Sequence, residues 1–414
     1  MSKSAKISPQ QERFSVNQLV GIGVFTRLLI DTGVQVFFPF LKVMADGIGI
    51  TTVEMGRLIS LRSAMGLLAP VFGTIAQRKG NRFVMRFGLL TASFGYLLLG
   101  LSTNLWTAAF GIVLSAIGSF AFLPTLQAYL SARLPYGKRA RGLGIVEYAW
   151  ALSGIVGLFF VGQLIAVTDW RVPMFILSGG LFFWYVFYYW LPTSDVDWAP
   201  PEIQDGPTKR SRRQRIRKFF DLGINRRSAW ANLTVNGLAM FSAMTLFVTY
   251  GVWLESEYQL GPSILGIVAL VLGVSDLIGS ILVSAISDRI GKRRSVILGG
   301  IVAAIGFMVL PWFNVGLVPA VIGIVLARGA FEFTIVSNIP LMSEQVPEQR
   351  GKMMGAGTAF GLFGTSLAGV TGPWVYDLYG VLGVGITAAI TMTLMVMVTW
   401  IFVREPELDQ IGFD

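Results

Sequence analysis

The sequence predicts an all-α integral membrane protein, and three observations support this prediction. Hydrophobic residues make up 54% of the chain and charged residues 14%, and the mean hydropathy is +0.65, which is far from the balance of a soluble domain. Twelve apolar runs are each long enough to cross a bilayer as a helix of about 20 residues. A short basic turn occurs twice, about 211 positions apart. We therefore expect twelve transmembrane helices in two pseudo-symmetric six-helix bundles.

The apolar runs divide evenly between two halves of the chain. The first six lie near residues 17–41, 53–76, 83–102, 105–130, 142–167 and 171–191. The second six lie near residues 229–253, 264–287, 295–313, 316–342, 352–376 and 381–403. A segment rich in basic residues separates the two sets, and it is typical of a solvated or headgroup-facing connector. The predicted domains are an N-terminal bundle at 1–192, a cytoplasmic linker at 193–227 and a C-terminal bundle at 228–414.

Basic residues set the predicted orientation, because Lys and Arg next to transmembrane helices stay in the cytoplasm. They gather at the N-terminus and in every second loop, whereas the loops on the other side hold only Lys42 and Arg171. We expect a multi-pass protein of the plasma (cytoplasmic) membrane with both termini cytoplasmic. These loops and the linker account for most of the net charge of +10, so no nucleic-acid partner is expected.

The composition also limits the chemistry. The chain has no cysteine and no histidine, which excludes disulfides and removes the usual metal ligand and the usual proton carrier near neutral pH. Any proton chemistry therefore falls to carboxylates. The sequence contains no nucleotide-binding loop and no nucleophile motif. We expect no enzyme activity, no cofactor and no metal, and as partners a small-molecule substrate, protons and membrane lipids.

Both copies of the basic turn lie between the second and third apolar runs of their half. A glycine permits a tight reversal there, and an arginine can reach phosphates or the carbonyls of a helix C-terminus. The residues of the two copies are, first, Gly73, Gln77, Arg78, Gly80 and Arg82, and second, Asp288, Arg289, Gly291, Lys292 and Arg293. Two readings remain open, a gating role and plain marking of topology.

With this turn, the chain resembles the major facilitator superfamily over nearly its whole length, in particular bacterial efflux-type members for drugs or sugars. The second copy matches the family's pattern apart from Ser284, which replaces the leading glycine, and the first has Gln77 where the family usually has Asp. The resemblance implies a monomer that exposes a central site alternately to each side. It also implies that spans one, four, seven and ten line the central cavity. Gln77 lacks the carboxylate thought to latch the outward-open state, which implies a weaker latch.

Ionisable residues inside the spans are the strongest candidates for function, because each costs about 2.5–3.5 kcal/mol at a helix centre on insertion scales. Arg27 and Asp31 lie four apart on span one, and Arg328 and Glu332 lie four apart on span ten. This spacing places each pair on one helix face. Each pair is either a self-neutralising brace or a site in which a carboxylate binds a proton. Asp31 is the first candidate for the proton carrier, Glu332 the second and the isolated Asp276 the third.

Polar side chains on the spans supply the candidates for substrate binding, although amides in membranes also join helices. They are Arg27, Gln35, Gln127, Asn232, Asn236, Arg328 and Asn338. Glu147 on span five is assigned instead to bridges that switch between the two halves. Together with the resemblance, these observations predict a secondary active transporter with rocker-switch alternating access that couples a small drug-like or sugar-like compound to protons. The resemblance to efflux-type members implies that it is an antiporter that exports this compound.

Two alternatives remain. The first is a facilitator or importer of a small organic anion held by Arg27 and Arg328. The second belongs to another class, a non-transporting membrane receptor or scaffold that uses the basic linker as its signalling surface.

Overall fold

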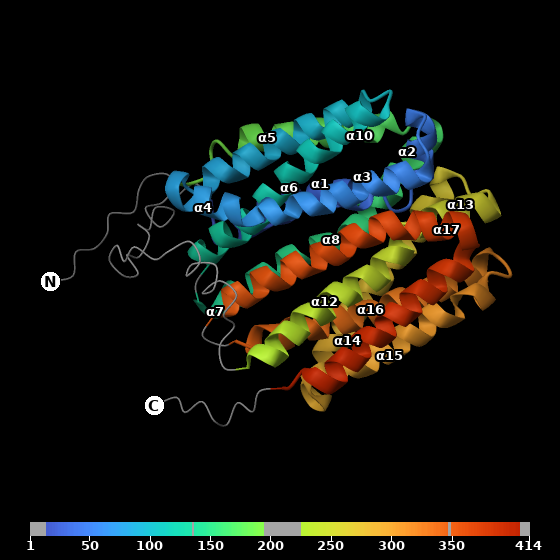
Figure 1. Ribbon diagram of the computed structural model, residues 1–414. Helices are drawn as coiled ribbons and strands as arrows, with labels where there is room; N and C mark the ends of the chain where they lie inside the picture. The colour runs from blue at the N-terminus through green and yellow to red at the C-terminus, as the bar shows by residue number, and fades with distance from the viewer. Residues whose placement is uncertain (1–13, 135, 194–224, 347–348, 406–414) are drawn as a thin grey trace, which may run out of the picture. The chain divides into compact units, whose positions relative to one another are not determined.

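The computed structural model describes residues 14–134, 136–193, 225–346 and 349–405, and all regular structure in these ranges is helical (Figure 1). The all-α fold class predicted from the sequence is therefore confirmed. The predictions for the two termini and for nearly all of the linker lie outside the described residues. So do the side chains of Ser284 and Asp288 in the second basic turn.

The helices before the linker begin with α1 (Val16–Gln35), whose start is fixed by a capping box between Ser15 and Gln18. The others are α2 (Leu41–Ile48), α3 (Thr52–Ala64), α4 (Ala69–Lys79), α5 (Asn81–Gly100), α6 (Leu105–Arg133), α7 (Tyr136–Glu147), α8 (Ala149–Leu152), α9 (Phe159–Val167) and α10 (Arg171–Phe187). After the linker come α12 (Arg226–Phe247), α13 (Tyr250–Tyr258), α14 (Pro262–Ile290), α15 (Lys292–Val309), α16 (Leu317–Glu344) and α17 (Arg350–Phe402).

The predicted spans all have helical counterparts. Nine helical segments in the described chain are long and apolar enough to cross a membrane. One of them, α17, is in fact two helices that meet at Gly380, where a φ of 60° interrupts the helical backbone. The remaining two spans are α10, a shorter apolar helix, and α1, whose charged residues lower its hydropathy.

Several predicted spans are interrupted, for local reasons. The first run was expected to continue to residue 41, but α1 ends at Gln35 and α2 begins at Leu41. Pro39 lies between them and disfavours helical backbone at the residue before it. The second run is split by a 3₁₀ turn at Met65–Leu68, directly before the N-terminus of α4 with its Pro70. The fifth contains a π-helical segment at Ser153–Leu158.

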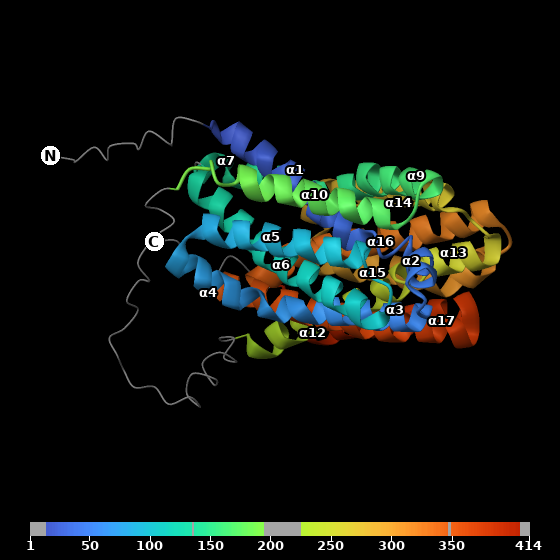
Figure 2. The ribbon, with the colours of Figure 1, turned by 90° about the horizontal axis from the view of Figure 1, so that it is seen from above.

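The chain forms two compact units. The first comprises residues 1–37, 43–50 and 65–206. Within it α5 packs along both α6 and α10 (Figure 2). The approach of α5 to α6 is close enough that a Cβ on Gly95 would lie 2.3 Å from the backbone nitrogen of Ser115, so the glycine is required by packing.

The second unit comprises residues 38–42, 51–64 and 207–414. Within it α12 packs along α17, and α15 packs against α16 and α17. The short α3 also belongs to this unit, because it packs against α17: Ser60 Oγ donates to the carbonyl of Ser366 at 2.6 Å, and Ser366 Oγ donates back to the carbonyl of Ser60 at 2.9 Å. A division at the linker into 1–192 and 228–414 stays a prediction.

Candidate functional site

The first unit contains a buried cluster around Arg27 of α1. Its Nε donates to Asp31 Oδ2 at 3.1 Å, and its Nη1 and Nη2 donate to Glu147 Oε1 and Oε2 at 2.5 and 2.7 Å. The side chains of Arg27 and Asp31 are 10% and 1% exposed, whereas that of Glu147 is 51% exposed. The predicted Arg27–Asp31 pair is therefore present. Glu147, assigned from the sequence to switching bridges, instead completes this cluster.

Two predicted glutamines lie near Arg27 but do different things. Gln127 of α6 donates to Glu147 Oε1 at 2.7 Å and so joins the cluster. Gln35 donates to the carbonyl of Trp150 at 2.9 Å and to Ser153 Oγ. Gln35 therefore ties the end of α1 to α8 and the π-helical segment, and Gln127 is the amide that shares a partner with Arg27.

The second unit contains a corresponding cluster around Arg328 of α16, but its pairing differs from the prediction. Arg328 Nε and Nη2 donate to Asp276 Oδ1 and Oδ2 of α14, each at 2.6 Å. Both side chains are buried. Glu332, expected to pair with Arg328 one turn away, instead accepts from Ser280 Oγ at 3.1 Å. Asp276, expected to be isolated, offers both oxygens to the planar guanidinium, which favours this two-pronged geometry.

The two arginines occupy the same place in their helices. Arg27 lies eleven residues after Val16, where α1 begins, and Arg328 lies eleven residues after Leu317, where α16 begins. In both helices an acid follows four residues later. Each unit therefore places an arginine, with an acid four residues later, at the same distance from the start of a helix.

Each cluster has one carboxylate more than it has guanidinium groups. The first unit places Asp31 and Glu147 around Arg27, and the second places Asp276 and Glu332 near Arg328. With both acids ionised, each cluster would carry a net negative charge. Across the described residues, no group of three or more potential ligands is placed to hold a metal ion. The surplus carboxylates can instead be neutralised by protons or by a cationic ligand.

Three predicted asparagines form a chain of amides in the second unit. Asn232 Nδ2 donates to Asn338 Oδ1 at 3.0 Å, Asn338 Nδ2 donates to Asn236 Oδ1 at 3.5 Å, and Asn236 Nδ2 donates to the carbonyl of Gly357 at 2.8 Å. At the start of this chain, Asn232 Oδ1 is buried and has no hydrogen-bond partner in the described structure. The chain links α12, α16 and α17 and leaves one acceptor available.

The two basic turns have the same backbone and the same long-range contact. Gly80 and Gly291 have φ values of 85° and 89°, which L side chains rarely adopt. Arg82 Nη1 donates to the carbonyls of Tyr189 and Leu191 at the end of α10, at 3.1 and 2.8 Å. Arg293 Nη2 donates to the carbonyl of Trp400 near the end of α17, at 2.6 Å. Each arginine therefore binds carbonyls near a helix C-terminus, where positive charge is favourable.

The other turn residues make fewer contacts. Gln77, Arg78 and Arg289 are exposed, and Gly73 has open space beside it. Lys292 Nζ forms an ion pair with Glu344 of α16, and its backbone N–H donates to Glu405 Oε1 at 3.0 Å. The gating role of these turns stays a prediction.

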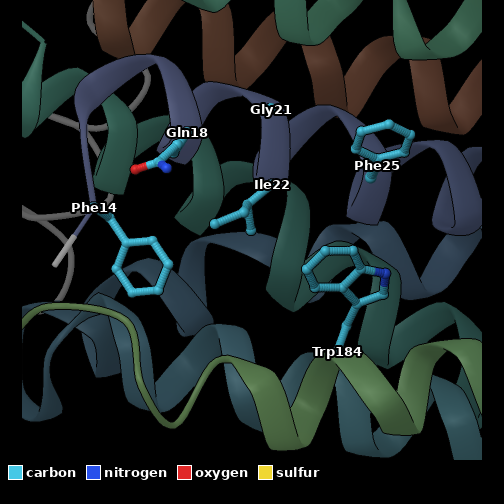
Figure 3. A pocket seen from close by; sticks show the side chains of 6 residues that line it. All are labelled: Phe14, Gln18, Gly21, Ile22, Phe25 and Trp184. Carbon is cyan, nitrogen blue, oxygen red and sulfur yellow. The ribbon is translucent and has the colours of Figure 1, made fainter.

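The first unit also has a cavity of about 320 Å³ between α1 and α10 (Figure 3). It is lined by Phe14, Gln18, Gly21, Ile22, Phe25 and Trp184. Gln18 contributes an amide and Trp184 an indole N–H, and the other lining side chains are apolar. None of the residues predicted for substrate or proton binding lines this cavity.

Comparison with known proteins identifies the family. The profile of the Major Facilitator Superfamily matches residues 23–325 and 233–412. The chain belongs to the Major Facilitator Superfamily. It is therefore a multi-pass membrane transporter of small molecules and not an enzyme.

Relatives within the superfamily carry names that indicate different roles. The chain is 24% identical over 383 residues to the uncharacterized MFS-type transporter YwfA of Bacillus subtilis, covering 91% of this chain and 90% of the relative. It is 22% identical over 301 residues to the multidrug resistance protein MdtG of Yersinia enterocolitica, covering 70% and 69%. It is 24% identical over 386 residues to the cis,cis-muconate transport protein of Acinetobacter baylyi, covering 86% and 90%.

The fold is also that of solved transporters in this superfamily. A crystal structure of a D-xylose-proton symporter superposes with a TM-score of 0.75 at 15% identity, covering 93% of this chain and 97% of that protein. The inward-open xylose transporter XylE of E. coli superposes with a TM-score of 0.72 at 16% identity, covering 95% and 98%. At these identities the likeness concerns the fold alone.

Proposed function

We propose that this transporter is a proton-coupled exporter of a small drug-like or sugar-like compound in the plasma membrane, working as a monomer by alternating access. The observation that supports this proposal most is that each cluster, around Arg27 and near Arg328, has one carboxylate more than it has guanidinium groups. An unneutralised carboxylate at membrane depth is costly. Binding a proton there would raise the charge of the site by one unit, and releasing it would restore the original charge in each transport cycle.

Glu332 is the carboxylate best placed to carry that proton. Asp31 accepts from the guanidinium of Arg27, and Asp276 accepts from that of Arg328 at both oxygens; both already have a cationic hydrogen-bond partner. Glu332 has a hydroxyl donor, Ser280, as its hydrogen-bond partner. The order of candidates expected from the sequence, with Asp31 first, is thus reversed in this proposal.

Arg328 can link the protonation state of Glu332 to the packing of α16 against α14. It lies one helical turn from Glu332 and holds Asp276 on a neighbouring helix. While Glu332 is protonated, Arg328 has one anionic partner. Once Glu332 loses its proton, a second anion competes for the same guanidinium and weakens the tie between α16 and α14. A change in protonation would in this way become a change in helix packing.

For the substrate, we propose that amides provide the polar contacts. Gln127 in the first unit and Asn232 in the second each belong to a polar cluster, and Asn232 Oδ1 is an acceptor without a partner in the described chain. An acceptor of this kind would bind a hydroxyl or an ammonium group of a substrate. Asn236 and Asn338 would hold Asn232 in place through the amide chain.

A second candidate function is uptake of a small organic anion, favoured by the likeness to a cis,cis-muconate transport protein. In that function Arg27 and Arg328 would hold the substrate's carboxylate. The geometry favours this less, because the three nitrogens of the Arg27 guanidinium already donate to carboxylates. An anion would have to compete with Asp31 and Glu147 for this guanidinium.

Proton release by the purified protein in weakly buffered detergent would separate these functions. The ligands would be tetraphenylphosphonium, cis,cis-muconate and xylose, each added to wild type, Glu332→Gln, Asp31→Asn and Asp377→Asn. Asp377 is an exposed acid on α17 and matches the change of charge. We expect ligand-dependent proton release that Glu332→Gln abolishes and Asp377→Asn leaves intact. Ligand binding without proton release in wild type would refute proton coupling.

A further inference from the structure

A second cavity lies at the junction between the start of α12 and the end of α17, in the second unit. Its volume is about 300 Å³, and it is lined by Asn225, Arg227, Ser228, Ile401, Phe402 and Arg404. Unlike the apolar cavity between α1 and α10, it has two guanidinium groups and an amide in its wall. Its chemistry is therefore that of a site for a negatively charged group.

The backbone of Arg404 is fixed by hydrogen bonds to two buried side chains. Ser228 Oγ accepts from the backbone N–H of Arg404 at 2.9 Å and donates to Gln345 Oε1 at 2.5 Å. Gln345 Nε2 donates to the carbonyl of Arg404 at 3.0 Å. Since Ser228 and Gln345 are both buried, this junction holds the ends of α12, α16 and α17 together. The position of Arg404 is thus set before any ligand binds.

Neither arginine of the cavity has an anionic partner in the described chain. The guanidinium of Arg227 lies over the ring of Phe402, at 4.8 Å from its centroid, and no carboxylate comes within ion-pair distance of Arg227 or Arg404 among the described residues. Glu405, the next residue along the chain, turns away and accepts from the backbone N–H groups of Lys292 and Arg293 at 3.0 and 3.3 Å. The nearest acid in sequence is therefore already engaged.

The cavity lies where transmembrane helices α12 and α17 begin and end, so it is expected at the depth of the lipid headgroups. Trp400 and Ile401, on the last turn of α17, are 68% and 61% exposed, as expected of side chains that face lipid at the edge of the hydrocarbon layer. The basic turn at Lys292 and Arg293 contacts the same end of α17. This end of the unit is predicted to face the cytoplasm, where the leaflet carries anionic lipids and basic pockets between helices bind their headgroups.

We propose that this cavity binds the phosphate ester of an anionic phospholipid headgroup, with Arg227 and Arg404 as its ligands. The planar guanidinium forks suit phosphate oxygens. Ile401 and Phe402 provide an apolar wall for the glycerol backbone and the start of the acyl chains. A soluble phosphate ester shares the charged chemistry but would make no use of that wall.

Binding to the intact purified protein tests this proposal, by native mass spectrometry in detergent at physiological ionic strength. The probes are dihexanoyl phosphatidylglycerol, dihexanoyl phosphatidylcholine and glycerol 1-phosphate. The variant is Arg227→Gln/Arg404→Gln, which leaves the backbone bonds of Arg404 in place. Its control is Arg226→Gln/Arg294→Gln, which removes two exposed arginines that do not line the cavity.

We expect one site that prefers phosphatidylglycerol to both other probes, and an apparent affinity for it that the cavity variant weakens by about tenfold or more. The control variant should change it by less than about twofold, because Arg226 and Arg294 lie outside the cavity and charges there are screened by salt. Equal losses in the two variants, or equal binding of phosphatidylcholine, would overturn the proposal. Glycerol 1-phosphate binding as tightly as the lipid would overturn the lipid assignment. Thermal unfolding of both variants checks that each is folded.

Discussion

Arg328 forms a two-pronged ion pair with Asp276 on α14, not with Glu332 one turn along its own helix. The geometry explains the choice. Asp276 presents both carboxylate oxygens to Nε and Nη2 at 2.6 Å, so that two parallel charge-assisted bonds form at once. The ring of Phe247, 4.3 Å from the guanidinium carbon, adds a cation–π contact. This ion pair therefore joins two helices, and Glu332 is left for another role.

Removing Asp276 should destabilise the folded protein, because its ion pair with Arg328 is buried. We expect Asp276→Asn to lower the free energy of unfolding by about 3–5 kcal/mol, since the buried charge of Arg328 then loses its two-pronged carboxylate partner. Removing both charges in Asp276→Leu/Arg328→Met should recover most of this loss. Thermal unfolding in detergent measures both effects. A double variant as unstable as the single one would show that the ion pair itself, not the uncompensated charge, supplies the stability.

Asp31 and Glu147, the two acids that bind Arg27, should contribute differently to stability. Asp31 is 1% exposed and Glu147 is 51% exposed, so water can replace Glu147 but not Asp31. We expect Asp31→Asn to destabilise the protein by about 3 kcal/mol and Glu147→Gln by about 1 kcal/mol or less. The measurement is again thermal unfolding of the two variants side by side. Equal losses would mean that Glu147 is less hydrated than its exposure implies.

The positive φ values at Gly80 and Gly291 predict that alanine is strained at both turns. We expect Gly80→Ala and Gly291→Ala each to cost about 1–3 kcal/mol of stability. Gly73→Ala is the control, because it lies inside α4 with no atom near its new Cβ, and there alanine should be neutral or stabilising by about 0.5–1 kcal/mol. If Gly80→Ala behaved like Gly73→Ala, the turn would adopt another backbone conformation in solution.

The sequence predicted the features that depend on local pattern. Bilayer thickness sets the length of an apolar helix, so the spans could be found from hydropathy alone. The repeat of the basic turn is visible in the sequence itself. In the structure, Arg82 and Arg293 of its two copies donate to equivalent carbonyls, those of Tyr189 and Trp400. The break near Pro39 was not predicted, although the local effect of a proline on the residue before it explains it.

The partners across helices could not be predicted in this way. The spacing of Arg328 and Glu332 says that they share a helix face, but the competing acid Asp276 comes from 52 residues away in the chain. Glu147 was missed at the Arg27 cluster for the same reason: nothing local shows that α7 passes beside α1. The asparagines Asn232 and Asn338 were found as polar residues on spans, whereas their direct hydrogen bond depends on how α12 and α16 pack.

The contact between α3 and α17 leads to a last prediction. A Cβ on Gly56 would lie 2.4 Å from the carbonyl oxygen of Gly369 and 2.6 Å from Pro373 Cγ. Backbone atoms cannot move aside as a flexible side chain would, so Gly56→Ala must push α3 away from α17. The reciprocal bonds between Ser60 and Ser366 should then weaken, and this contact should open more often.

Because the chain has no cysteine, a single introduced thiol can report this opening with no native thiol to remove first. A single Ser60→Cys substitution places a thiol inside the contact, where it is shielded from a membrane-permeant maleimide, because Ser60 is buried. We expect Gly56→Ala in this background to raise the labelling rate by about tenfold, as an overpacking penalty above 1 kcal/mol would give. The control is Gly355→Ala on α17, whose Cβ would meet no atom within 4 Å. Unchanged labelling in Gly56→Ala would show that α3 and α17 are farther apart in the membrane than in this structure.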